Sequence, residues 1–221
     1  MAAAQFTRSG RQRPVTQFVT VPTKRYRNTN HRCGADNVVR PKILLISGSL
    51  RHMSSNTGLL RTAVEVAPDG VDCLIYDRLA WLPAFNPDDD HHPLPAEVQR
   101  LRDAIHESDA IIFSTPEYAG ALPGSLKNLL DWAIGDEQIR SIYDKPVGWA
   151  NASPRGANGA HSELRTVLSY AHARIIDKAC AQIPVTPRMV GPDGLIDDGP
   201  SRSAILEIFN VLLAATTPDP V

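Results

Sequence analysis

The stretch that decides the fold is Lys42-Ile43-Leu44-Leu45-Ile46-Ser47-Gly48-Ser49, in which a predicted strand, the apolar run Lys42–Ser47, ends at Gly48. A strand with one solvated face alternates apolar and polar residues, whereas Ile43–Ile46 contains no polar position. Such a run is typical of a central strand in a parallel sheet that is buried on both faces. We therefore expect helices on both sides of the sheet.

Outward from this strand, predicted strands and helices alternate along the chain. Further strands are expected at Val71–Tyr76, Asp109–Thr115, Pro146–Ala152 and about Ala181–Val185. Helices are expected at Asn56–Val66, Ala96–Ser108, a segment with Leu126, Leu129, Leu130 and Ala133 on one side, Ala160–Ala173, and Ser201–Ala215 with Ser201 as its N-cap. This alternation predicts an α/β fold, an open five-stranded parallel sheet. Because ligands bind such sheets at the carboxyl ends of the strands, the loops Gly48–Asn56, Pro116–Pro123 and Ser153–Gly159 form the candidate site.

The composition is that of a globular protein with an uneven charge. With 221 residues, 43% of them hydrophobic and 21% charged, the chain is neither collagen-like nor disordered throughout. Residues 1–40 hold eight Lys or Arg and one acid, Asp36, a formal charge of +7 that leaves −8 for the remainder. We predict a basic, disordered N-terminal extension over 1–40 and one α/β domain over 41–221. Because the positive charge lies outside the domain, we expect no nucleic-acid partner, although contact of the extension with another anionic partner or a neighbouring subunit stays open.

The cysteines and the apolar runs favour a cytoplasmic protein. Cys33, Cys73 and Cys180 lie far apart and predict neither a disulfide framework nor a zinc site. The first residues lack the apolar segment of a secretory signal, with a transit peptide in residues 1–27 as the alternative. The longest apolar runs have four or five residues, so we expect no membrane partner.

Several familiar sites are not predicted. The chain contains neither G-x-G-x-x-G after its first strand nor G-x-x-x-x-G-K-[ST], which disfavours a Rossmann dinucleotide site and an ATPase. The run Asp88-Asp89-Asp90-His91-His92 is expected to be a solvated acidic loop rather than a metal site, because adjacent residues seldom converge on one ion. His161 and His172 flank a predicted helix and are expected on the surface or as cap residues.

The first loop, Gly48–Thr57, is rich in groups that hold an anion. It supplies hydroxyls, the Asn56 amide and the Arg51 guanidinium just ahead of a helix. Backbone N–H groups and the helix dipole at a helix N-terminus favour negative charge. A phosphomonoester fits these groups; the alternative is an ordinary connection whose Ser and Asn side chains cap the helix.

The second loop, Pro116–Pro123, is bounded by prolines and follows the strand at Asp109–Thr115. It presents backbone amides, the ring of Tyr118 and the carboxylate of Glu117. These groups suit the edge of a flat heterocycle. The alternative is a loop shaped by proline and glycine in which Tyr118 is simply packed.

Together the two loops resemble the NADPH-dependent FMN reductase family of flavodoxin-like proteins. The first matches its motif G-S-x-R-x-x-S-x-N, through Gly48, Ser49, Arg51, Ser54 and Asn56. The second matches P-E-Y-…-P-x-x-L-K-N-x-x-D-W, through Pro116, Glu117, Tyr118, Pro123, Leu126, Lys127, Asn128, Asp131 and Trp132. The resemblance covers about residues 42–216 and implies the strand order 2-1-3-4-5. It also implies FMN as cofactor and NADPH or NADH as hydride donor.

By this resemblance, the first loop would hold the FMN phosphate, the second would run along the isoalloxazine ring, and the third would lie at its far edge. The predicted cofactor-binding residues are Ser49, Arg51, Ser54, Ser55, Asn56, Thr57, Pro116, Glu117, Tyr118, Ala119, Gly120, Ser153, Arg155 and Gly156. The family commonly has Asn where this chain has Ala119, so one side-chain amide near the flavin is missing. Arg155 is a candidate for the phosphate of the nicotinamide nucleotide, with a solvated loop arginine as the alternative.

We expect no catalytic side chain and no bound metal, because the flavin itself accepts the hydride. The family implies a ping-pong cycle that delivers electrons to a quinone, azo, metal-oxyanion or flavin acceptor. It also implies a homodimer or homotetramer, with Asp131-Trp132 near the interface. The alternative function is a flavodoxin-like one-electron carrier, whose charge of −8 would steer a basic redox partner. A third hypothesis, a relative with a degenerate flavin site, rests on Ala119 alone.

Overall fold

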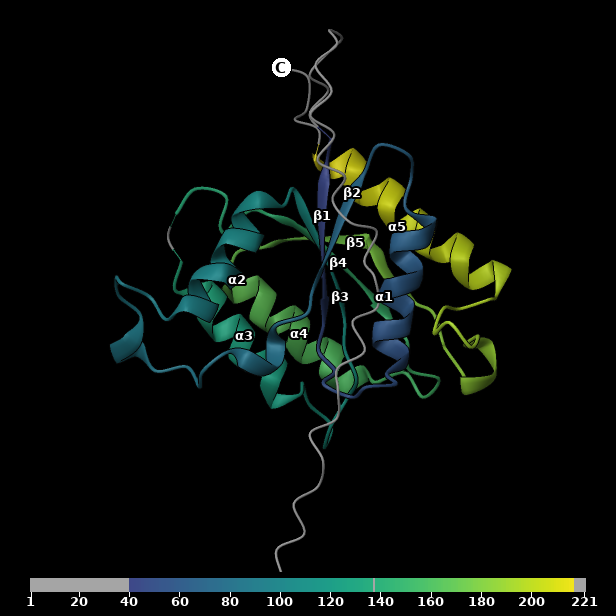
Figure 1. The fold of residues 1–221 in the computed structure, drawn as a ribbon, viewed down its shortest axis with the longest axis horizontal. Coiled ribbons are helices and arrows are strands. Elements are labelled where there is room, and N and C mark those ends of the chain that lie inside the picture. The colour runs from purple at the N-terminus through teal and green to yellow at the C-terminus, as the bar shows by residue number, and fades with distance from the viewer. Residues whose placement is uncertain (1–39, 137, 217–221) are drawn as a thin grey trace, which may run out of the picture. The chain divides into compact units, whose positions relative to one another are not determined.

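The computed structural model describes residues 40–136 and 138–216, which form an α/β fold around one parallel sheet (Figure 1). Its strands are β1 (Lys42–Ser47), β2 (Asp72–Tyr76), β3 (Ala110–Ser114), β4 (Pro146–Asn151) and β5 (Arg174–Gln182). They pair in the order β2-β1-β3-β4-β5 and all are parallel. The predicted fold class and strand order are therefore confirmed. The predicted N-terminal extension lies outside the described residues except for Arg40.

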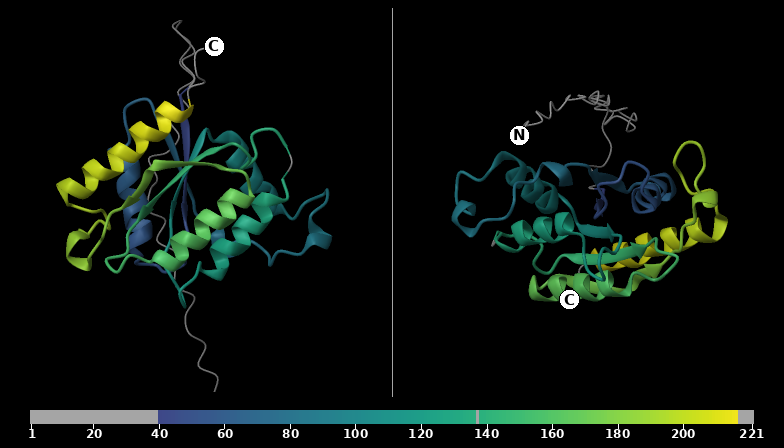
Figure 2. Two further views of the ribbon diagram at one scale, coloured as in Figure 1. Left: turned by 180° about the vertical axis from the view of Figure 1, so that it is seen from behind. Right: turned by 90° about the horizontal axis from the view of Figure 1, so that it is seen from below.

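Helices cover both faces of the sheet, as Figures 1 and 2 show. The helices are α1 (Ser55–Val66), α2 (Ala96–Glu107), α3 (Gly124–Ile134), α4 (Asn158–Tyr170) and α5 (Gly199–Thr216). Alternate residues of β1 supply the two cores: Ile43 and Leu45 face α1 and α5, whereas Leu44 and Ile46 face α2, α3 and α4. Burial on both faces explains why β1 reads as an unbroken apolar run. No helix within residues 40–136 and 138–216 is long and apolar enough to cross a membrane.

The last strand differs from its prediction at Ala181–Val185. β5 spans Arg174–Gln182 and lies at the edge of the sheet, where charged residues such as Asp177 and Lys178 stay exposed and hide the apolar pattern. Its pairing with β4 shifts in register between Val147 and Trp149, as in a β-bulge. The apolar residues Ile183 and Val185 follow the strand, and their amides still bond to the backbone carbonyls of Asn151 and Ala152.

Two predicted helix termini are also corrected. α5 begins at Gly199, and Ser201 is not its N-cap; instead the Asp198 carboxylate accepts bonds from the amide and the hydroxyl of Ser201, at 2.9 and 2.5 Å. α4 spans Asn158–Tyr170 rather than Ala160–Ala173. It ends earlier because His172 has a left-handed backbone, with φ of 51°, which terminates a helix.

The loop between β2 and α2 packs on α3. Asn128 accepts a bond from the Phe85 amide at 2.7 Å and donates one to the Pro83 carbonyl, which also accepts from the Trp132 indole at 3.0 Å. Trp132 is fully buried within its own chain, and the place of Asp131-Trp132 near a subunit interface stays a prediction. The second half of the P-E-Y-…-D-W motif therefore secures this loop.

The acidic loop is only partly solvated. Asp90 forms an ion pair with the buried Arg102 at 2.7 Å, whereas its neighbours Asp88 and Asp89 are exposed. Within the described part of the chain, no group of three or more His, Cys, Asp or Glu side chains is arranged to hold a metal ion.

Candidate functional site

The three predicted loops leave the same edge of the sheet, at the carboxyl ends of β1, β3 and β4, which is the lower end in Figure 1. β1 and β3 are neighbours, and the chain passes from β1 outward to β2 before it returns to β3. The order of the strands therefore reverses between β1 and β3, where parallel sheets commonly bind ligands. The amide of Gly48 bonds to the Ser114 carbonyl at 2.9 Å and joins the first two loops at their origin.

The first loop turns tightly through its own hydroxyl groups. Ser47 Oγ lies 3.1 Å from Thr57 Oγ1 and accepts a bond from the Ser49 amide at 3.2 Å. The Ser49 hydroxyl accepts from the Arg51 amide at 3.3 Å. These bonds fold the loop over the beginning of α1. Ser47 was missed by the sequence analysis, because it reads as the end of the strand.

The start of α1 leaves donors free for an anion. Ser54 occupies the N-cap position without a side-chain cap bond, and the first turn holds no acidic residue. Arg51 is exposed, and none of the ion pairs among the described residues includes it. Ser55 lies partly exposed in the same turn. The arrangement therefore combines a positive side chain with unpaired donors at a helix N-terminus.

Asn56 points into the fold rather than into the loop. Its side chain is buried and lies 3.0 Å from the hydroxyl of Ser114, which donates to the Ala150 carbonyl at 2.7 Å. This chain of contacts links α1 to β3 and β4. The structure thus places Asn56 as a support for the loop, and Ser114 is a supporting residue that the sequence analysis missed.

The second loop contains a tight two-residue turn. The backbones of Tyr118 and Ala121 exchange two hydrogen bonds, at 3.1 and 3.0 Å, around Ala119 and Gly120. Both central residues have positive φ, 51° for Ala119 and 77° for Gly120, as a type I′ turn requires. Asn-Gly is the preferred pair in such a turn, so the Asn that the family commonly carries here suits the backbone by itself.

Two carboxylates anchor this turn to α4. Glu117 accepts a bond from the Ala160 amide at 3.0 Å in the first turn of α4, and Glu163 accepts one from the Leu122 amide at 2.7 Å. A carboxylate at a helix N-terminus is stabilised by the free amides and the dipole. Glu117 therefore positions the loop backbone. Glu163 could not be found from the sequence, since it lies 41 residues from its partner.

Gly159 lets α4 approach the turn closely. A Cβ atom at Gly159 would overlap the carbonyl oxygen of Gly120 and would lie 3.0 Å from Glu117 Oε2. Any larger residue there must push the turn away from the helix.

The third loop is held by Asn151. Its side chain donates to the Gly156 carbonyl and accepts from the Ser153 amide at 2.9 Å, while the Ser153 hydroxyl accepts from the Arg155 amide at 3.3 Å. Gly156 has φ of 93°, a conformation that favours glycine. Arg155 is exposed and takes part in none of the ion pairs among the described residues.

His161 was expected on the surface or as a cap residue, and the surface position is wrong. It is buried in the first turn of α4, and its Nδ1 lies 2.8 Å from the Ala157 carbonyl, so Nδ1 carries the proton. Burial lowers the pKa of His161 and favours the neutral ring. The residue therefore fixes the end of the third loop without carrying a charge.

Loops that follow the carboxyl ends of β1, β2 and β3 expose four large apolar side chains, which we call the apolar rim. Leu50 and Met53 from the first loop, Trp81 from the loop after β2, and Tyr118 from the second loop are all more than half exposed. In contrast, Cys73 and Cys180 lie partly buried, and burial raises the pKa of their thiols to about 12 and about 11. The two thiols act as packing groups.

Comparisons with known proteins agree on one family. The family model for NADPH-dependent FMN reductases matches residues 41–186. The chain is 31% identical over 172 residues to an NAD(P)H-dependent FMN reductase of Pseudomonas aeruginosa, covering 77% of this chain and 92% of that protein. It is 34% identical over 182 residues to a probable NADPH:quinone oxidoreductase of Oryza sativa subsp. japonica, covering 78% and 87%. Among solved structures, FerB, a flavoenzyme NAD(P)H:(acceptor) oxidoreductase from Paracoccus denitrificans, aligns with a TM-score of 0.70 and 26% identity over 80% of this chain and 97% of that one.

Proposed function

Because the chain belongs to the NADPH-dependent FMN reductase family, we propose that it transfers a hydride from NADPH or NADH to bound FMN and then reduces a small-molecule acceptor. One observation supports the proposal for this chain in particular. The start of α1, with its free donors, and the anchored turn at Tyr118–Ala121 both follow strands at the point where the strand order reverses.

The residues at this edge fit FMN. Arg51 and the unpaired donors at the start of α1 suit a phosphate, which prefers charge-assisted bonds to Arg and to backbone N–H groups. The turn at Ala119-Gly120 has no bulky side chain, so the edge of a ring system can approach its backbone. The predicted cofactor-binding residues Asn56, Glu117 and Ser153 contribute indirectly, because their side chains already hold the loops in place.

In the proposed mechanism, the side chains hold the cofactor and support the loops. FMN, when bound, supplies the hydride-accepting chemistry. The protein's part is to hold the phosphate through Arg51 and α1, and to keep the loop backbone rigid through Glu117 and Glu163.

We propose a quinone as the acceptor class, in a ping-pong cycle in which the nicotinamide nucleotide leaves before the acceptor enters. The exposed rim formed by Leu50, Met53, Trp81 and Tyr118 supports this choice, since flat apolar molecules bind well to aromatic and aliphatic surfaces. Azo, metal-oxyanion and flavin acceptors are the further candidates. A homodimer or homotetramer in the cytoplasm is part of the same proposal.

The test is an anaerobic titration of the protein reconstituted with FMN. We expect NADPH or NADH to bleach the oxidised-flavin absorbance, and a quinone added afterwards to restore it. Colour that no pyridine nucleotide bleaches would instead indicate the one-electron carrier, and failure to bind FMN would indicate a degenerate site.

Arg51→Ala tests the phosphate site directly. Loss of a hydrogen bond to a charged group costs roughly 1.5–3 kcal/mol, so FMN affinity should fall by a factor of about 10 to 150. Riboflavin lacks the phosphate, and its affinity should not change. Arg100→Ala, on the exposed surface of α2, is the matched control. Equal losses for FMN and riboflavin would remove Arg51 from the phosphate site.

A further inference from the structure

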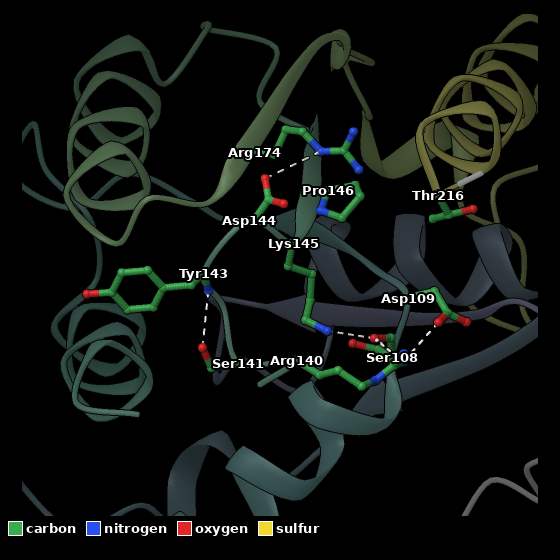
Figure 3. A pocket seen from close by; sticks show the side chains of 10 residues that line it. All are labelled: Ser108, Asp109, Arg140, Ser141, Tyr143, Asp144, Lys145, Pro146, Arg174 and Thr216. Carbon is green, nitrogen blue, oxygen red and sulfur yellow. Dashed lines mark hydrogen bonds and ion pairs between the residues drawn. The ribbon is translucent and has the colours of Figure 1, made fainter. Parts of the chain in front are cut away.

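A cavity lies at the end of the sheet opposite to the three loops, where β3, β4 and β5 begin. It has a volume of about 220 Å³ and is lined by the α2–β3 connection, the loop that precedes β4, the first residue of β5 and the end of α5 (Figure 3). The three predicted loops lie at the carboxyl ends of the strands, so the cavity and the candidate flavin site are separated by the length of the sheet (Figure 1).

Three cationic side chains line this cavity: Arg140, Lys145 and Arg174. Two carboxylates accompany them. Asp109 already accepts bonds from the Lys42 amide at 2.8 Å and from Arg140 at 2.9 Å. Asp144 lies 4.0 Å from Arg174, and its side chain is 94% exposed, which makes this a weak pair. The cavity therefore keeps positive charge that its own carboxylates do not neutralise.

Lys145 is the most unusual of the three. It is buried, with a relative exposure of 6%, and its ammonium group donates to one neutral acceptor, the Ser108 carbonyl, at 2.6 Å. None of the ion pairs among residues 40–136 and 138–216 includes Lys145. Burial, together with the nearby Arg140 cation, lowers the pKa of Lys145 to about 8. An ammonium group with three protons and one acceptor is incompletely satisfied at this site.

The segment that presents these groups is held in an uncommon conformation. Arg140 and Asp144, on either side of the buried Ser141 and Ile142, both have positive φ, at 69° and 55°. Non-glycine residues adopt this conformation at a cost, and the surrounding bonds must maintain it. Here the Asp144 amide bonds to the His172 carbonyl at 2.9 Å, and Arg140 donates to the carbonyls of His106 and Ser108.

We propose that this cavity binds the phosphate group of a small molecule between Lys145, Arg140 and Arg174. A phosphate supplies the acceptors that the Lys145 ammonium lacks, and its oxygens match the planar donors of an arginine. Thr216 also lines the cavity, with its hydroxyl donating to the Leu213 carbonyl at 2.8 Å, while the ring of Tyr143 points away from the cavity (Figure 3). This proposal is independent of the function proposed for the other end of the sheet.

The experiment titrates the FMN-reconstituted full chain with inorganic phosphate and with pyrophosphate, in chloride at constant ionic strength, by calorimetry and thermal unfolding. We expect saturable binding that weakens at least tenfold in Lys145→Met and in Arg174→Gln. Lys178→Met, which removes an exposed charge from the same strand as Arg174, should bind as the wild type does.

The Arg51→Ala variant distinguishes phosphate binding in the cavity from phosphate binding at the first loop. Phosphate binding that survives Arg51→Ala and is lost in Lys145→Met supports the cavity. Binding that is lost in Arg51→Ala and kept in Lys145→Met belongs to the first loop and overturns the proposal, as does the absence of saturable binding in the wild type. Arg174→Gln keeps the test valid if Lys145→Met fails to fold.

Discussion

Replacing Ala119 by Asn should stabilise the protein, although Ala119 is exposed and makes no packing contact to improve. The residue has φ of 51° at the first central position of the Tyr118–Ala121 turn. An L-residue other than Asn, Asp or Gly adopts this conformation at a cost of roughly 1–2 kcal/mol, whereas Asn tolerates it. We expect Ala119→Asn to raise the free energy of unfolding by about 1 kcal/mol and Tm by about 2–4 °C for a folded unit of this size.

The assay is urea unfolding followed by circular dichroism, performed with and without FMN. A purely backbone effect predicts the same gain in both states, whereas a contact between the new amide and the flavin adds a gain only when FMN is bound. Ala84→Asn is the matched control, because it makes the same exchange at an exposed residue whose φ is not positive. It should change stability by less than about 0.5 kcal/mol.

Ala119→Gly is the second comparison. Glycine removes the strain but also increases the freedom of the unfolded chain, which costs about 0.4–1 kcal/mol, so its net gain should be smaller than that of Asn. If Ala119→Asn leaves the unfolding midpoint unchanged or lowers it with an unchanged m-value, the account of the turn is wrong.

Two further predictions concern other parts of the molecule. Gly159→Ala should weaken FMN binding at least fivefold in a fluorescence titration, because the new Cβ would overlap the Gly120 carbonyl; Gly124→Ala, whose Cβ would meet open space at the start of α3, should bind FMN normally. Helix propensity alone predicts that Gly159→Ala raises the free energy of unfolding by about 1 kcal/mol, and it gives no reason for FMN binding to weaken. The pKa of Lys145, about 8, lies below its unfolded value of 10.5, so the unfolded state binds more protons between these values and stability rises with pH across this window. Lys145→Met removes that dependence, so the free energy of unfolding of the variant minus that of the wild type should be about 2–3 kcal/mol more positive at pH 7 than at pH 10 in parallel urea titrations. Parallel curves for the two proteins would contradict the assignment of a buried, charged Lys145.

The central strands could be predicted from the sequence because burial on both faces leaves a local signal. β1 and β3 are runs of buried apolar residues, and their observed bounds lie within one residue of the predicted ones. β5 carries no such signal. It lies at an edge, exposes Asp177 and Lys178, and changes register against β4, and a register shift depends on the partner strand rather than on the strand's own residues.

In the site, too, features with a local sequence signal could be predicted, and features that depend on a distant partner were missed. The loops could be located from the order of strands and helices alone, since the carboxyl ends of parallel strands meet at one edge. The groups that support them could not, because each acts across a long separation in sequence. Ser114 meets Asn56 from 58 residues away, and Glu163 meets Leu122 from 41 residues away. Nothing local to a serine in a strand or a glutamate on a helix indicates such a role.

Some loop side chains support the loops and others face the ligand, and this difference affects how an acceptor would be selected. Side chains that the family motif places near the flavin, such as Asn56 and Glu117, are bonded to Ser114 and to the α4 amide of Ala160. Apart from the exposed arginines Arg51 and Arg155, what remains to face a ligand is backbone, together with an exposed apolar rim that includes Met53 and Trp81. A site built to hydrogen-bond one substrate group rejects analogues strongly, whereas an apolar surface separates related molecules by only about 1–3 kcal/mol per methylene. A rim of this composition therefore favours discrimination by flatness and size, and a protein that uses it should accept a range of aromatic acceptors with similar efficiency.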